Sequence, residues 1–319
     1  MANGFNRFET VTVFGGATLD RIARTNLRPV MGASNPGTVR RSPGGVGFNV
    51  TSILARLGVP ARLVTRVGQD ADGEAIVLAA KAAGIDTGAL TVSPFAPTAA
   101  YHAAFDDTGN LIVGVADMTI CDEITPASLE PAAIANDPDA FWVIDANLPA
   151  ETIEFLTEEA SANRIPVAAV SVSPAKAVKL VPVLDRLAFL FTNRREAPVL
   201  LDRPPQETAT VADLAAELAG PRATSVIVTN GAEPLAVARG GEVRSFAPLR
   251  ANVAGVNGAG DSFAAGTIQG LAEGLSLHDA VRHGLAAAVL TLEAGSVAAA
   301  SFAPGALASA VVAGARIAS

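Results

Sequence analysis

The alternation of short apolar segments with longer amphipathic ones constrains the fold of this chain more than any other feature. From about residue 140, the pattern predicts four short strands, at 141–144, 167–170, 187–191 and 225–229. It predicts helices between and after them, at 149–162, 175–184, 210–218, 262–275 and 277–292, with a last helix after Pro304. Short buried strands that alternate with helices are typical of a parallel sheet covered on both faces. The sequence therefore predicts an α/β fold with a central, mainly parallel sheet.

The first 140 residues contain the same pattern and two interruptions of it. Strands are predicted at 11–14 and 62–67, and helices at 49–57 and 73–83. By contrast, 21–41 and 97–115 have strand-like pieces with turn signals and no helix, and 105–111 is predicted to form a hairpin. We expect these two stretches to form a small sheet outside the main layer. Because no repeat or long linker interrupts the sequence, residues 1–319 are predicted to form a single domain.

Composition and charge argue against several classes of protein. Half of the 319 residues are hydrophobic and 17% are charged, which suits a large aliphatic core. The net charge of −8 argues against binding of nucleic acid. The longest apolar stretches, such as 285–292, are too short to span a membrane, and the first residues contain no signal-peptide core. Cys121 is the single cysteine and cannot form an internal disulfide, so we expect a cytoplasmic protein.

The strongest local signal for chemistry is the segment Asn257 to Phe263, which reads Asn-Gly-Ala-Gly-Asp-Ser-Phe. Its small residues allow a ligand to approach the backbone, and the helix that follows begins with free amides and a partial positive charge. An anionic phosphoryl group fits such a site, and Asp261 could accept a proton from an attacking hydroxyl. An ordinary helix N-cap explains the same residues equally well, so both interpretations stay open at this point.

A second glycine-rich turn, Ser42 to Asn49, also precedes a predicted helix. Gly44 and Gly45 allow a substrate to lie against the backbone, and Asn49 can both donate and accept hydrogen bonds. A structural turn with Asn49 as an N-cap is the alternative. The glycine spacing matches neither a Walker A loop nor the Rossmann fingerprint.

Three further polar residues follow predicted strands. Asp20 comes after the first strand, where a carboxylate can bind two hydroxyls of a sugar, with a solvated loop acid as the alternative. Asn193 and Glu196 follow the strand at 187–191. Glu196 could hold Mg²⁺ through water, because hard cations prefer oxygen ligands. An exposed carboxylate at a helix start is the alternative interpretation of Glu196.

The order of these motifs resembles the ribokinase-like (PfkB) family of carbohydrate and nucleoside kinases. The resemblance covers essentially the whole chain and depends on Gly44-Gly45, Asn193-Arg194-Arg195-Glu196, Thr229-Asn230-Gly231 and Gly258-Ala259-Gly260-Asp261. It implies a three-layer α/β sandwich with a small β lid formed by about 21–41 and 97–115. In this family the lid often forms a homodimer, so the resemblance implies a homodimer here as well.

The resemblance also implies a role for each motif. Asp261 would be the catalytic base, next to an anion hole formed by Gly258, Ala259 and Gly260. The sugar would be bound by Asp20, Gly44, Gly45 and Asn49. ATP would lie at Asn193, Thr229 and Gly231, with Mg²⁺ near Glu196.

Within the family, the chain looks most like the pseudouridine kinases, in the stretches 33–37, 42–49, 115–118 and 145–149. This resemblance implies ATP-dependent conversion of pseudouridine to pseudouridine 5′-phosphate. Thr98, Tyr101 and Asp117 could face the base, with lid core or a solvated turn as the alternative. The alternative functions are another kinase of the family, for ribose, a fructose-type sugar, adenosine or another nucleoside, and a non-catalytic sugar-binding regulator.

Three departures from the family pattern bear on these implications. Gly255 and Asn257 precede the Gly258 turn where relatives usually have Asp or Asn and Thr, and that Asp helps to bind a monovalent cation, so K⁺ dependence is left open. Pro234 replaces the second glycine of the nucleotide motif. Thr18 stands where ribokinases have Asn, which argues mildly against free ribose.

Overall fold

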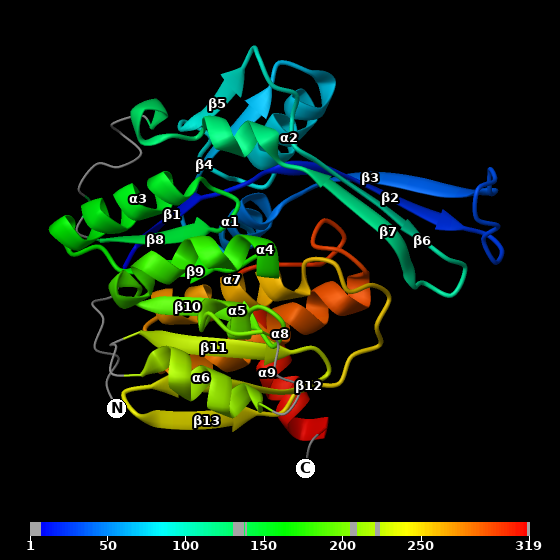
Figure 1. Ribbon diagram of the computed structural model, residues 1–319. Coiled ribbons are helices and arrows are strands. Elements are labelled where there is room, and N and C mark those ends of the chain that lie inside the picture. Colours follow the sequence, from blue (N-terminus) through cyan, green and yellow to red (C-terminus); the bar gives the residue numbers. More distant parts are fainter. Residues whose placement is uncertain (1–7, 130–136, 138, 205–208, 221–223, 318–319) are drawn as a thin grey trace.

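The computed structural model describes residues 8–317 apart from 130–136, 138, 205–208 and 221–223, and it is an α/β protein of three layers (Figure 1). A large sheet forms the middle layer, helices cover both of its faces, and a smaller sheet projects from one end. The predicted fold class is confirmed by this architecture. Within the described ranges, no helix combines the length and the apolar character that crossing a membrane requires.

The large sheet contains nine strands in the described part of the chain, in the order β13-β12-β11-β10-β9-β8-β1-β4-β5. They are β1 (Thr10–Phe14), β4 (Ala61–Gly68), β5 (Leu90–Ser93), β8 (Ala140–Asp145), β9 (Val167–Val170), β10 (Phe189–Asn193), β11 (Ser225–Asn230), β12 (Glu233–Arg239) and β13 (Glu242–Phe246). The sheet is parallel except at one edge, where β12 runs antiparallel to both β11 and β13. Parallel strands need cover on both faces, which explains why β8 is buried along its whole length.

Two hydrophobic cores lie on opposite faces of this sheet. One is formed with α1 (Val46–Arg56), α2 (Ala71–Ala82), α7 (Ala259–Ala272), α8 (Leu277–Ala294) and α9 (Ala306–Ile317). The other is formed with α3 (Ala150–Asn163), α4 (Pro174–Ala177), α5 (Ala197–Leu200), α6 (Val211–Ala219) and the 3-10 helix η4 (Val178–Arg186). It also includes Ile124 and Leu129, which directly follow the 3-10 helices η1 (Thr119–Glu123) and η2 (Pro126–Ser128). Side chains of a strand alternate between faces, so Phe141 and Val143 of β8 enter the first core and Trp142 and Ile144 the second.

The smaller sheet has four strands in the order β3-β2-β6-β7. They are β2 (Thr18–Thr25), β3 (Gly37–Gly44), β6 (Ala100–Phe105) and β7 (Leu111–Asp117). The strands come from the two stretches that interrupt the helix and strand alternation, and β6 and β7 form the predicted hairpin. Only three residues separate β1 from β2, and Gly45 alone separates β3 from α1. The small sheet is therefore attached to the body through the loop after β1 and the turn before α1 (Figure 1).

The helix predicted at 175–184 differs from the observed structure. Only its first turn, α4, is α-helical, and Val178–Arg186 is a 3-10 helix that contains Pro182. Proline lacks the N–H that an α-helix needs and its ring clashes with the preceding turn. The segment still buries Leu180, Val183 and Leu184. The hydrophobic pattern was therefore right about burial and wrong about the type of helix.

Candidate active site

Asp261 and Asn49 lie 212 residues apart in the sequence and are in direct contact in the fold. Asn49 is in the first turn of α1 and Asp261 in the first turn of α7, and these two helices pack together on one face of the large sheet. The Nδ2 of Asn49 donates a 2.8 Å hydrogen bond to Oδ2 of Asp261. The N-cap residue of α1 is Gly45, not Asn49. The Asn49 side chain therefore orients Asp261 and does not cap its own helix.

The surroundings of Asp261 make its carboxyl group unusually basic. Burial raises the pKa of Asp261 to about 6, the negative charges of Asp145, Asp20 and Glu196 add to this effect, and the hydrogen bond from Asn49 opposes it. A carboxyl group with a pKa near 6 is mostly ionised at neutral pH and accepts a proton more readily than an ordinary Asp. This combination is suited to a general base.

Backbone N–H groups at the start of α7 lie beside this carboxylate. Gly258 is the N-cap residue, with a φ of 78° in the left-handed region that glycine adopts readily. The first N–H groups of a helix have no partner within it, and the space around Gly260 is open. The N–H of Ala259 is less available, because it donates a 3.4 Å hydrogen bond to the carbonyl of Val256. An anion is therefore best received by the amides of Gly260 and Asp261.

Asp20 lies where the small sheet joins the body. Burial raises its pKa, and Thr18 Oγ1 donates a 2.6 Å hydrogen bond to its Oδ1. A Cβ added to Gly44 would lie 2.3 Å from Oδ2 of Asp20, and one added to Gly45 would lie 2.7 Å from the carbonyl oxygen of Gly16. These two glycines therefore make room for Asp20 and for the neighbouring backbone. The sequence had suggested a different reason for them, namely close approach of a ligand.

Four residues at this site were not among the sequence candidates. Asp145, the last residue of β8, accepts a hydrogen bond from the N–H of Gly16. Met118 and Asn147 both lie over Gly16, since an added Cβ there would be 2.7 Å from Cε of Met118 and 3.2 Å from Nδ2 of Asn147. Lys176 in turn donates a hydrogen bond to Oδ1 of Asn147. Asp145 and Asn147 follow a predicted strand, so the rule that ligands bind beyond the carboxyl ends of parallel strands could have identified them.

Asn193 and Glu196 form a tight turn between β10 and α5. Oδ1 of Asn193 accepts hydrogen bonds from the N–H of Arg195 at 2.9 Å and of Glu196 at 3.1 Å, which fixes the turn. Glu196 is only 5% exposed and accepts a hydrogen bond from the hydroxyl of Ser171. The alternative interpretation of Glu196 as an exposed carboxylate is therefore wrong.

The surroundings of Glu196 fit a Mg²⁺ ion that is bound together with ATP. Among the residues that the structure describes, no group of three or more His, Cys, Asp or Glu side chains could hold a metal. Mg²⁺ keeps several waters and is usually bound by one or two carboxylates and by the phosphates of the substrate. A single buried carboxylate that is electrostatically coupled to Asp261 agrees with that pattern.

Thr229 and Gly231 lie at the turn from β11 to β12. Thr229 is directly opposite Asn193 in the register of β10 and β11, so these candidates are neighbours. The hydroxyl of Thr229 donates a 3.3 Å hydrogen bond to the carbonyl of Thr192, and Gly231 has a φ of 63°.

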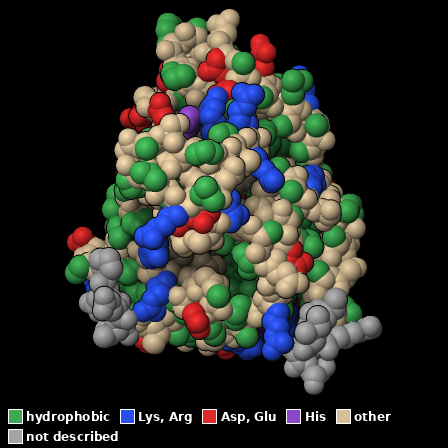
Figure 2. All heavy atoms as spheres, turned by 90° about the vertical axis from the view of Figure 1, so that its right-hand side faces the viewer, with side chains coloured by type: hydrophobic (Ala, Val, Ile, Leu, Met, Phe, Trp, Pro, Cys, Tyr) green, Lys and Arg blue, Asp and Glu red, His purple; other side chains and the backbone are tan. Residues whose placement is uncertain are grey.

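Viewed from the side on which the small sheet projects, Lys and Arg side chains border a hollow in the molecular surface (Figure 2). Basic side chains on this face suit a polyphosphate ligand although the net charge of the chain is −8.

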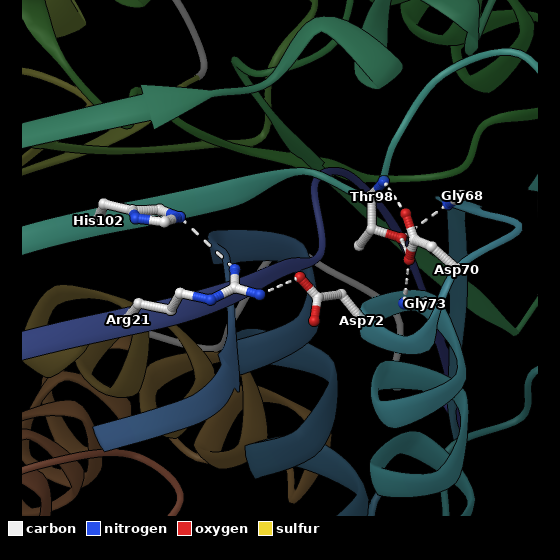
Figure 3. A network of polar contacts seen from close by, with 7 residues as sticks. All are labelled: Arg21, Gly68, Asp70, Asp72, Gly73, Thr98 and His102. Atoms are coloured by element: carbon white, nitrogen blue, oxygen red, sulfur yellow. Dashed lines mark hydrogen bonds and ion pairs between the residues drawn. The ribbon is translucent and has the colours of Figure 1, made fainter. Parts of the chain in front are cut away.

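Thr98 was predicted to face the substrate, but its polar atoms are used inside the fold (Figure 3). Its hydroxyl donates to Oδ1 of Asp70 at 2.6 Å and accepts from the N–H of Gly68 at 2.8 Å. Its own N–H donates to Oδ2 of Asp70 at 2.8 Å. Asp70 also caps α2 by accepting from the N–H of Gly73. The structure therefore assigns buried Thr98 to the anchoring of α2.

Tyr101 and Asp117 lie on opposite faces of the small sheet. Tyr101 pairs with Asp20, whereas Asp117 pairs with Ala100, and successive residues of a strand point to opposite faces. Half-buried Tyr101 therefore shares a face with Asp20. Asp117 is exposed, and its Oδ1 accepts hydrogen bonds from the N–H and hydroxyl of Thr119. For Asp117 the geometry favours the alternative interpretation, a solvated turn.

The loop before Asp261 does not fit the monovalent cation that the family resemblance implies. A Cβ added to Gly255 would lie 2.6 Å from the carbonyl oxygen of Gly295, so a carboxylate has no room there. The N–H groups of Ala254 and Gly255 donate hydrogen bonds to the carbonyl of Leu292, at 2.8 and 3.3 Å. The loop before Asp261 is therefore joined to the C-terminal end of α8 by direct backbone contact.

Comparison with known proteins extends these observations. Residues 9–303 match the family model described as pfkB family carbohydrate kinase. The chain is 29% identical to the pseudouridine kinase of Escherichia coli (strain K12) over 276 residues, which cover 85% of this chain and 87% of that relative. It is 28% identical to the ribokinase of Bacillus subtilis (strain 168), with 88% and 92% covered. Among solved structures, a carbohydrate kinase from Agrobacterium tumefaciens is 33% identical with a TM-score of 0.81, and the match covers 95% of this chain and 97% of that one.

Proposed function

This chain belongs to the pfkB family of carbohydrate kinases and phosphorylates a sugar or nucleoside with ATP, and we propose that its acceptor is the 5′-hydroxyl of pseudouridine. The observation that carries the chemistry is the hydrogen bond from Asn49 to Asp261, because it fixes a carboxylate of raised pKa at a helix N-terminus. The choice of acceptor is supported by the 29% identity to a pseudouridine kinase over most of both chains.

In the proposed reaction, Asp261 accepts the proton of the acceptor hydroxyl as its oxygen attacks the γ-phosphorus of ATP. Asn49 holds Oδ2 of Asp261, and within the described chain Oδ1 makes no hydrogen bond. The N–H groups of Gly260 and Asp261 stabilise the charge on the transferred phosphoryl group, where the helix dipole also contributes. Glu196 would hold Mg²⁺ that is bound with ATP, and the ion would supply positive charge beside the phosphates. Asp20 binds the sugar hydroxyls.

The test is an ADP-release assay with purified protein, ATP, Mg²⁺ and separate acceptors: pseudouridine, uridine, ribose, adenosine and fructose. We expect kcat/KM for pseudouridine to exceed that for each other acceptor by about tenfold or more, since buried polar groups discriminate strongly between analogues. Mass spectrometry of the product should show a monophosphate at the 5′ position. A strong response to another acceptor, with none to pseudouridine, would overturn the proposed substrate.

A second candidate is a kinase for ribose, which is favoured by the 28% identity to a ribokinase over a similar share of the chain. The same assay separates the two, because ribose has no base and pseudouridine has one. Another sugar or nucleoside of the panel is the remaining enzymatic alternative. A non-catalytic sugar-binding regulator is disfavoured by the oriented carboxylate of Asp261, and phosphoryl transfer to any acceptor would exclude it.

We also propose a cytoplasmic homodimer that forms through the small sheet. Val39, Ala23, Ala104 and Val113 form a row across all four strands of this sheet. Val39 is 67% and Val113 54% exposed, and contiguous exposed apolar side chains often mark an interface. Light scattering should give the mass of a dimer, and Val113→Glu should give the mass of a monomer. A monomeric unaltered protein would contradict this assembly.

A further inference from the structure

Asp145 connects three segments of the site, and neither the sequence motifs nor the proposed mechanism assigns it a role. It is fully buried at the end of β8. Its Oδ2 accepts hydrogen bonds from the N–H of Gly16 at 2.9 Å and of Gly47 at 3.0 Å. Its Oδ1 accepts a hydrogen bond from the N–H of Asn147 at 2.8 Å. Three backbone donors therefore converge on one carboxylate.

The segments that Asp145 joins carry the acceptor-binding residues. Gly16 lies in the loop that leads from β1 to Asp20 on β2, and Gly47 lies in the first turn of α1. The same turn contains Asn49, which orients Asp261. The position of Asp145 therefore sets the distance between Asp20 on one side of the acceptor and the pair of Asn49 and Asp261 on the other.

Asp145 also supplies the cap that α1 lacks. The N-cap residue of α1 is Gly45, which has no side chain, and no acidic residue occurs in its first turn. A carboxylate that accepts a hydrogen bond from a free N–H at a helix N-terminus satisfies that donor and interacts favourably with the helix dipole. Here the carboxylate comes from β8, because Asp145 lies 98 residues after Gly47 in the chain.

The backbone around Asp145 is adapted to a carboxylate at this position. A Cβ added to Gly15 would lie 2.3 Å from Oδ2 of Asp145, and one added to Gly47 would lie 2.8 Å from the carbonyl carbon of Gly15. The three contacts are all N–H donors, so the side chain must offer only acceptors. An amide of the same shape would direct its NH₂ group at one of these donors.

We propose that Asp145 is a positioning residue whose buried carboxylate holds the loop after β1 and the start of α1 at the separation that the acceptor requires. The inference rests on the proposed kinase function, since it concerns the same site. It predicts that loss of this carboxylate impairs the use of the acceptor and leaves the binding of ATP unchanged. The nucleotide side of the site is formed by Asn193 on β10, Thr229 on β11 and Glu196 in the turn before α5. None of the three hydrogen bonds that Asp145 accepts comes from these elements.

The first test compares Asp145→Asn with the unaltered protein, using the acceptor that the ADP-release assay identifies. We expect kcat/KM for the acceptor to fall about 30-fold or more, because small misplacements of reacting groups have large effects on rate. We expect KM for ATP to change by less than about twofold, since nothing on the nucleotide side moves. Asp185→Asn, on the exposed end of η4, is the matched control and should leave both parameters unchanged.

The second test needs no acceptor. Hydrogen exchange of the backbone N–H of Gly16 and Gly47 should be at least about tenfold faster in Asp145→Asn, with unchanged exchange in β10 and β11. A double-mutant cycle adds specificity: Gly15→Ala should impair acceptor use when Asp145 is present and add little to Asp145→Ala, because the added Cβ then has room.

The outcomes separate the two proposals. If the unaltered protein transfers phosphate to no acceptor, the proposed function fails, and the exchange rates alone then decide whether Asp145 holds the two segments. If the unaltered protein is active, the inference is overturned by an Asp145→Asn variant that keeps normal acceptor kinetics, or that raises KM for ATP and the acceptor equally. Unchanged exchange at Gly16 and Gly47 would overturn it as well.

Discussion

Asp261 shows how one residue obtains its chemistry from its surroundings. Burial and three neighbouring carboxylates raise its pKa to about 6, and Asn49 restricts its orientation. A general base must be ionised to act, so protonation of Asp261 should remove activity. We expect kcat/KM for the acceptor to be constant above about pH 7 and to fall about tenfold per pH unit below about pH 6. The profile should be measured at saturating Mg-ATP, and a rate that is unchanged down to pH 5 would contradict the role of Asp261.

Replacement of the same residue tests its role directly. Asp261→Asn keeps the shape of the side chain and an oxygen for the hydrogen bond from Asn49, but it removes the proton acceptor. We expect kcat to fall about 10²- to 10⁴-fold, which is the usual contribution of a general base. Binding of ATP, measured by calorimetry without acceptor, should change by less than about threefold. Near-normal turnover would show that another group accepts the proton.

Motifs in the sequence singled out Asp261 as a candidate but did not indicate which groups contact it. The Gly258 turn was compatible with an N-cap or a phosphoryl site, and the structure excludes Asp261 as the N-cap, because Gly258 is the N-cap and Asp261 lies inside the first turn. Thr98 was assigned to the ligand, although its hydroxyl is used by Asp70 and Gly68. Asp145 was missed because its importance comes from backbone donors that approach it from distant segments. The sequence therefore indicated which residues have suitable functional groups, but not which atoms those groups contact.

At the scale of elements, the N-terminus of α2 depends on a single carboxylate. Asp70 accepts hydrogen bonds from Gly73 in α2 and from both the N–H and hydroxyl of Thr98. Nearby, Arg21 on the small sheet forms a 2.5 Å ion pair with Asp72 of α2 (Figure 3). We expect Asp70→Ala to lower the free energy of unfolding by about 1–3 kcal/mol, because it removes a cap and leaves buried donors unpaired.

Urea unfolding measures this loss for Asp70→Ala. Asp213→Ala, in the capping box of α6, is the control, because Asp213 is exposed and its partners are within its own helix terminus. The control should lose less stability than Asp70→Ala. Equal losses would show that the contacts with Thr98 add nothing to the cap.

The loop that leads into α7 allows a prediction of how kcat depends on the monovalent cation. Gly255 contacts the backbone of Gly295 where related kinases are implied to hold a monovalent cation. We therefore expect kcat to change by less than about twofold when K⁺ is replaced by Na⁺ or tetramethylammonium at constant ionic strength. Gly255→Ala should lower kcat under all these conditions, because its Cβ would push the loop before α7 away from the C-terminal end of α8. A tenfold activation by K⁺ would show that a cation site exists despite this contact.

Elements were predictable where the hydrophobic pattern is repeated and less predictable where one residue changes the local geometry. The strands β8, β9 and β11 lie where the sequence places them, since each is a short buried run. The segment with Pro182 became a 3-10 helix. The antiparallel edge of β12 and β13 was not predicted, because β13 is exposed along most of its length and gives only a weak apolar signal.

At the scale of the whole molecule, the topology explains why distant motifs meet. The strands β1, β8, β9, β10 and β11 are parallel, so their carboxyl ends lie at the same edge of the sheet. Asp20 follows β1, Asp145 ends β8 and Glu196 follows β10. Binding sites of parallel α/β sheets lie beyond this edge. The fold therefore brings carboxylates that repel one another close together, and this repulsion lowers the free energy of unfolding.

This cost leads to a last prediction, which concerns stability and not activity. The folded-state pKa of Asp261, about 6, is above the value of 3.8 for an ordinary Asp, so the folded protein binds more protons than the unfolded chain between about pH 4 and 6. The free energy that this group contributes to folding is therefore most favourable below pH 4 and is lost as the pH rises through 6. Asp261→Asn, which removes the charge, should be more stable than the unaltered protein at pH 8 by about 1–2 kcal/mol, after allowance for the partial exposure of the group.

Measuring both proteins at two pH values separates the effect of the Asp261 charge on stability from the effect of changing the side chain. Urea unfolding of both proteins should show the stability difference at pH 8 and a clearly smaller difference at pH 4.5, whereas Asp185→Asn, at an exposed position, should show none at either pH. A loss of stability in Asp261→Asn that is equal at both pH values would mean that the charge of Asp261 has no net cost, and it would contradict this prediction. A gain confined to high pH would mean that the protein retains this carboxylate for catalysis at the expense of its stability.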